Sequence, residues 1–129
     1  MACTNNKNTN GRLNAESYRT RVKENVVAGM LEFCQDEDCD FSKRDVKKCE
    51  RLLLNYIDQL SRLANPTDEA IMEQVKEVVL ALNKLNEKTD YSLIETLERE
   101  EIWQIIQDSA VECGLTSPAG DITEAWREW

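Results

Sequence analysis

The sequence contains no histidine, only four glycines and two prolines, and no long apolar run. Without histidine the chain lacks the usual general base, the Ser–His and Cys–His nucleophile pairs and the commonest metal ligand. The scarcity of glycine and proline disfavours a turn-rich β sandwich or barrel. No apolar stretch approaches the roughly 18 residues of a membrane span, and no secretory leader is recognisable. These absences favour a helical, non-enzymatic protein that is not embedded in a membrane.

Cysteine is present, but its pattern does not predict a disulfide framework. The five cysteines form an odd, irregularly spaced set, which is a poor basis for pairing. Cys49 and Cys113 fall on apolar helical faces, where a thiol behaves as a small hydrophobe. Cys34, Cys39 and Cys49 have C-x4-C-x9-C spacing, but a structural zinc site needs four ligands, and the chain has no histidine and no second cysteine pair. We therefore expect reduced cysteines, no zinc and a cytoplasmic location.

The 129 residues carry a formal net charge of −9. An acidic chain repels phosphate backbones, so we expect no direct nucleic-acid binding, whereas a basic protein partner is a candidate. The charge is uneven: residues 43–64 contain six basic and three acidic residues, and residues 92–113 contain one basic and six acidic residues. If these segments lie far apart, the protein has a basic face and an acidic face, and the acidic face is the better partner surface.

Apolar residues recur at helical spacing in four segments, which predicts four helices. Pro66 ends the second, because proline disfavours helical geometry in the residue before it. Gly114 offers the fourth a C-terminal cap. The predicted helices cover residues 17–34, 43–63, 67–86 and 92–113.

Polar residues at the starts of these segments predict their N-terminal caps. Ser42 and Asp45 have the spacing of a capping box, as do Ser92 and Glu95. Thr67 is a candidate N-cap for the third helix. Three of the four helix starts are therefore specified locally.

Short connections favour antiparallel neighbours, so these helices predict an all-α, antiparallel four-helix bundle-like domain over residues 16–129. The asparagine-rich residues 1–15 predict a flexible polar tail. At the other end, Asp121 is a candidate cap for a short fifth helix over residues 121–129. A homodimer through the apolar face of the first helix is an alternative use of that face.

Acidic residues at every second position, in the stretch QDEDCDFSKRD, are how a calcium-binding loop begins. Asp36, Asp38 and Asp40 hold these positions, but the loop also needs glycine at its sixth place and glutamate at its twelfth. Phe41 and Lys47 stand there instead. We interpret the acids as balancing the basic start of the second helix and its dipole. A degenerate calcium-binding helix–loop–helix is the alternative.

A second candidate metal site is the glutamate cluster of the fourth helix. Glu95, Glu98 and Glu101 follow an E-x-x-E pattern that resembles the first half of the magnesium site in all-α nucleotide pyrophosphohydrolases. No E-x-x-D partner follows it. A metal-dependent all-α hydrolase is therefore an alternative to our main prediction, which assigns no catalytic residue, cofactor or metal.

The candidate partner-binding residues lie on the fourth helix and at the C-terminus. Glu101, Asp108 and Glu112 share the face opposite the apolar stripe, so they should form an acidic surface. Trp126 and Trp129 are candidate anchors, because tryptophan is enriched at binding hot spots. The competing interpretation is that both tryptophans pack over one end of the bundle.

The stretches IETLEREEIWQIIQDSAVECGL and DITEAWREW resemble the C-terminal part of small, mostly uncharacterised bacterial all-helical proteins. Some of those proteins are immunity-like, neutralising a toxin. The resemblance implies a non-enzymatic cytoplasmic protein, acting as an acidic immunity-like or regulatory inhibitor of an unidentified basic partner such as a nuclease. It assigns no functional residue.

Overall fold

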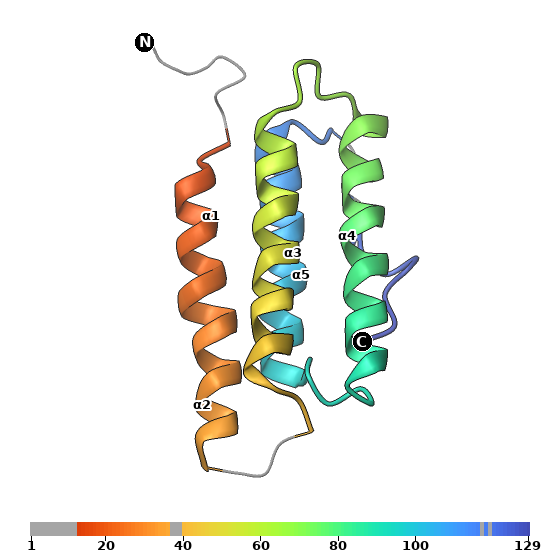
Figure 1. Ribbon diagram of the computed structural model, residues 1–129. Helices are drawn as coiled ribbons and strands as arrows, with labels where there is room; N and C mark the ends of the chain where they lie inside the picture. The colour runs from red at the N-terminus through yellow and green to blue at the C-terminus, as the bar shows by residue number, and fades with distance from the viewer. Residues whose placement is uncertain (1–12, 37–39, 117, 119) are drawn as a thin grey trace.

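The computed structural model describes residues 13–36, 40–116, 118 and 120–129, which fold into four helical rods (Figure 1). This confirms the predicted all-α class, and the described part of the chain contains no strand. The predicted tail falls mostly on residues 1–12, outside the described residues. The rods are α1 (Ala15–Arg21) continued by the π-helix η1 (Val22–Val27) and α2 (Ala28–Asp36), then α3 (Lys43–Ser61), α4 (Asp68–Lys88) and α5 (Thr96–Cys113).

Consecutive rods run in opposite directions along the molecule (Figure 1). The rods α3 and α5 pack on each other; the first rod lies against both on one side, and α4 contacts both on the other. After α5 the C-terminal segment, residues 120–129, returns along α4. In the part of the chain that the structure describes, no helix combines the length and apolarity that crossing a membrane requires.

Local capping explains where α3 and α4 begin. The Ser42 hydroxyl accepts a hydrogen bond from the Asp45 main-chain N–H, and the Asp45 carboxylate accepts one from the Ser42 N–H. Thr67 accepts from the N–H of Ala70. These bonds satisfy N–H groups that have no partner inside the helix. The capping box at Ser42 and the Thr67 cap are confirmed as predicted.

The start of α5 differs from its prediction. The Ser92 hydroxyl donates to the main-chain oxygen of Thr89, 2.6 Å away, instead of capping a helix. The side-chain oxygen of the buried Asn86 accepts from the N–H of Ile94 and holds the connection in a turn. The helix therefore begins only at Thr96. The predicted capping box at Ser92 is wrong because the Ser92 hydroxyl and the Ile94 N–H are both bonded to residues before them, which keeps this backbone in a turn.

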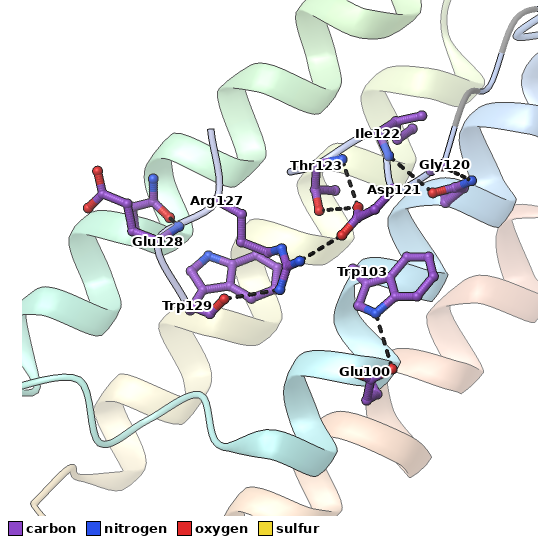
Figure 2. Close-up of polar contacts among 11 residues, drawn as sticks. Glu100, Trp103, Gly120, Asp121, Ile122, Thr123, Arg127, Glu128 and Trp129 are labelled. Carbon is purple, nitrogen blue, oxygen red and sulfur yellow. Dashed lines mark hydrogen bonds and ion pairs between the residues drawn. The ribbon is translucent and has the colours of Figure 1, made fainter. Parts of the chain in front are cut away.

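The C-terminal segment forms successive turns rather than the predicted short helix (Figure 2). The Asp121 carboxylate accepts from both the N–H and the hydroxyl of Thr123, which favours a turn over a helix. From α4, the amide of the buried Asn83 donates to the main-chain oxygen of Trp126 and accepts from the N–H of Glu128. The segment is thus attached to α4 through its own main chain.

The core is one cluster of apolar side chains from all the rods, and a short polar chain crosses it. The Tyr56 hydroxyl donates to the main-chain oxygen of Ile106, 2.8 Å away, and the Ser109 hydroxyl lies 3.3 Å from the Tyr56 oxygen. Burial raises the pKa of Tyr56, so the phenol remains a donor. Both groups are satisfied, and they tie α3 to α5 at the centre of the molecule.

The first rod is not a regular α-helix. At η1 the N–H of Ala28 bonds the oxygen of Lys23, five residues back, which is the π pattern. The wider turn lets two adjacent valines, Val26 and Val27, both face the core. The rod also starts earlier than predicted, because the Asn14 side chain accepts from the N–H of Ser17 and caps α1.

The cysteines divide into two groups. Cys49 and Cys113 are buried thiols, as predicted. Cys34 is disulfide-bonded, so the expectation of reduced cysteines throughout is wrong. The cytoplasmic location stays a prediction.

Candidate interaction site

The carboxylate of Glu112, predicted to face a partner, contacts the first rod instead. One oxygen accepts from the main-chain N–H of Asn14 at 2.7 Å, and the other lies 3.3 Å from the Tyr18 hydroxyl. Burial, followed by the negative charges of Glu112 and Asp108, raises the pKa of Tyr18 to about 12. The phenol therefore stays protonated and can keep donating to Glu112 at neutral pH.

The two other predicted acids make similar contacts. Asp108 forms an ion pair with Arg21 at 3.1 Å, and Glu101 accepts from the side-chain amide of Asn25 at 3.3 Å. We call Glu101, Asp108 and Glu112 the acidic seam, because all three join α5 to the first rod. Their use by a partner stays a prediction, and any partner would compete with these internal contacts.

The two C-terminal tryptophans pack against the core, and Figure 2 shows Trp129 beside Arg127. The guanidinium of Arg127 lies over the Trp129 ring, 5.2 Å from its centroid, and pairs with Asp121 at 2.7 Å. Trp126 is also half-buried, and its main-chain oxygen is bound by Asn83. The structure thus gives both predicted anchors an intramolecular packing role. Their role in binding a partner stays a prediction.

The predicted calcium loop lies partly outside the described residues, because Asp38 is not among them. Asp36 is the last residue of α2, and Asp40 is exposed just before α3. Asp45, which follows in the same stretch, accepts hydrogen bonds from Ser42 in the capping box. The described residues therefore neither assemble nor exclude a calcium loop.

The glutamates of the alternative hydrolase site are directed to different neighbours. Glu95 is exposed at the N-cap of α5, and Glu101 accepts from Asn25 in the acidic seam. A carboxylate oxygen of Glu98 lies against Gly29, where a Cβ atom would meet it at 3.1 Å. Across the described ranges, no three carboxylates or cysteines gather into a group that could hold a metal. The hydrolase alternative stays a prediction.

The buried thiols do not form a nucleophilic site. Burial raises the pKa of Cys49 to about 12, with smaller contributions from Glu50 and Glu98. The reactive form of cysteine is the thiolate, and Cys49 has almost none of it at neutral pH. We therefore assign Cys49 to packing.

Sequence reasoning missed an apolar groove at the end of the molecule where α2 ends and α5 begins (Figure 1). Its volume is about 380 Å³, and Met30, Phe33, Phe41, Leu93 and Leu97 line it. The groove lies where the first rod and α5 diverge: α5 packs along α1 and η1, whereas α2 packs on η1 and, less closely, on α3. We call it the α2–α5 groove.

Two large apolar side chains at this groove are exposed. Leu97 is 78% exposed and Phe33 is 50% exposed, although the Phe33 ring stacks on that of Phe41 with centroids 6.2 Å apart. The sequence contained a weak signal, since Leu97 lies off the apolar stripe of α5. Phe33, in contrast, continues the apolar stripe of the first rod. The sequence does not show that no neighbouring helix covers the Phe33 side chain.

Acidic side chains border the α2–α5 groove. Glu95 and Glu98 line the wall formed by α5. The groove therefore combines an apolar floor with a negative rim, which suits an apolar ligand carrying positive charge.

The chain matches no family model, no curated protein and no solved structure in the comparisons made.

Proposed function

We propose that the protein is a non-enzymatic interaction module that binds a basic, amphipathic helix of a partner protein in the α2–α5 groove. The observation that carries this proposal is the exposure of Leu97 and Phe33 beside an open apolar hollow. Exposed apolar patches with polar rims mark interaction sites, and an amphipathic helix placing its apolar face in a groove is a recurring recognition mode.

The charge of the groove selects the partner. Glu95 and Glu98 on the wall formed by α5 would repel an acidic peptide and attract a basic one. The net charge of −9 adds long-range steering of a basic partner. The narrower form of the proposal is an immunity-like or regulatory inhibitor that acts in the cytoplasm and covers the site of a basic toxin.

A designed peptide tests the groove without knowledge of the natural partner. The probe is an amphipathic helix of about 18 residues made of leucine and lysine in helical periodicity, titrated into ¹⁵N-labelled protein. We expect amide shifts to concentrate around Phe33 and Leu97. A leucine–glutamate peptide of the same pattern should cause no such shifts.

Two matched leucine variants separate the groove from general apolar contact. Leu97→Ser should weaken peptide binding by about tenfold or more, as loss of a central contact does. Leu80→Ser, at an exposed leucine of α4 outside the groove, should leave affinity unchanged. Equal weakening by both variants, or shifts spread along the acidic seam, would overturn the proposal.

A further inference from the structure

Seven basic side chains gather on one region of this acidic protein, along the first half of α3 and the last turns of α4. In the parts of the chain that the structure describes, none of the seven forms an ion pair. By contrast, Arg19, Arg21, Arg62 and Arg127 each pair with a carboxylate. We call the seven the basic region: Lys43, Arg44, Lys47, Lys48, Arg51, Lys84 and Lys88.

Four of these residues surround a hollow of about 390 Å³ between α3 and α4. Lys48 and Arg51 come from α3, and Lys84 and Lys88 come from α4. Leu52, Ala81 and Leu85 form its apolar floor. A hollow with a low-dielectric floor and several cations at its edge strengthens the attraction of an anion placed in it.

The centre of this hollow brings two ammonium groups together. The neighbouring Lys88 is the main cause of a lowered pKa at Lys48, because two ammonium groups repel each other and the loss of one proton relieves that repulsion. Arg44 acts in the same direction, and the opposing effect of Asp45 is smaller than that of Lys88. Asp45 is itself occupied by the Ser42 cap. An anion seated between Lys48 and Lys88 would convert this repulsion into attraction.

The charges that line the hollow between α3 and α4 favour a compact anion over an extended one. Towards the middle of the molecule the hollow continues into a second one of about 450 Å³ between the same two helices. That part is lined by amides and by Glu77 instead of cations. An acidic peptide or other long polyanion running along α3 and α4 would meet this carboxylate, whereas a compact anion of high charge would not.

We propose that the hollow between α3 and α4 binds a phosphate-bearing ligand, with one phosphate group between Lys48 and Lys88 and a second reached by Arg51 and Lys84. Phosphate provides several oxygens at high charge density, which lysine and arginine bind as charge-assisted hydrogen-bond donors. This site is separate from the α2–α5 groove and does not depend on what binds there.

Pyrophosphate is the probe, titrated at constant ionic strength and followed by amide shifts of ¹⁵N-labelled protein. We expect shifts confined to the first half of α3 and the last turns of α4, around Lys48 and Lys88. The double variant Lys48→Gln/Lys88→Gln should raise the dissociation constant about tenfold or more. The charge-matched control Lys23→Gln/Lys76→Gln, at two exposed lysines outside the hollow, should change it by less than about threefold.

Further arms identify the source of the phosphate and the class of anion. If the protein sediments with vesicles that contain phosphatidic acid, the phosphate belongs to a lipid headgroup. If the protein binds pyrophosphate but does not sediment with the vesicles, the ligand is a soluble phosphate compound. Both results support the site. Citrate or an oligoglutamate peptide binding as tightly as pyrophosphate would show that the region is not selective for phosphate and overturn the proposal. So would pyrophosphate binding that the double variant and its control weaken equally.

Discussion

The acidic seam of α5 and the basic region of α3 and α4 differ in whether their charged side chains have partners inside the molecule. Each carboxylate of the seam has a donor on the first rod, at 2.7 to 3.3 Å. The basic region gathers seven cations without an ion pair in the described part of the chain. The difference shows that net charge does not identify the surface a protein offers, because charges already bonded inside the molecule are less available to a partner.

The largest expected effect comes from breaking the seam at Glu112. Glu112→Ala leaves the Tyr18 hydroxyl and the Asn14 N–H without their acceptor, and Tyr18 is buried. We expect the free energy of unfolding to fall by about 1–3 kcal/mol, measured by urea denaturation. Glu124→Ala, at an exposed acid of the C-terminal segment, should stay within about 0.5 kcal/mol of the parent protein. Equal effects would mean that the seam contributes no specific stability.

The same contact predicts a response to alkaline pH. Tyr18 ionises near 12 in the folded protein and near its ordinary value of 10.0 in the unfolded chain. Its contribution to stability is therefore complete below pH 10 and is lost as the pH rises to about 12. Tyr18→Phe should lose less stability than the parent protein across this window, compared by urea midpoints at each pH. Identical losses would show that burial and the neighbouring acids do not raise the pKa of Tyr18 in the folded protein.

A smaller effect is expected at the exposed end of the seam. The side chains of Arg21 and Asp108 are 28% and 50% exposed, so water screens their ion pair. A double-mutant cycle with Arg21→Gln and Asp108→Asn should give a coupling energy below about 1 kcal/mol, decreasing further in about 1 M NaCl. A larger, salt-independent coupling would place this pair in a drier environment than the structure gives it.

The smallest effect is expected in the basic region. Lys88 lowers the pKa of Lys48, so the stability of the parent protein should rise as the pH increases from that lowered value to 10.5. Lys48→Gln should remove this rise and raise the urea midpoint at neutral pH relative to Lys76→Gln, which removes the same charge from an exposed site on α4 outside the basic region. If the two variants unfold at the same midpoint, Lys48 and Lys88 do not repel each other.

Features set by near neighbours in the chain were predictable. The Ser42–Asp45 capping box, the Thr67 cap and the Gly114 end of α5 each depend on residues within one helical turn. The all-α class followed because long apolar stripes at helical spacing have few alternatives.

Features set by distant contacts were not predictable. Asn86 fixes the backbone before α5, and Asn83 holds the C-terminal segment out of a helix. Both asparagines lie on a predicted helix, but its sequence does not show what they bind. The acidic seam was missed for a related reason: the polar face of α5 is visible in the sequence, whereas the identity of its neighbour is not.

The π-helix η1 also sets the rotational phase of the first rod. Tyr18 and Arg21, which bind the seam, lie before η1, whereas Met30 and Phe33, which line the α2–α5 groove, lie after it. Because a π turn holds one residue more than an α turn, removing one residue from η1 would let the rod continue as a regular α-helix with its two halves near their present phase. A chain shortened by a single residue there should therefore keep both the seam and the groove, whereas the same deletion in a regular α-helical turn between them would rotate one half by about 100°.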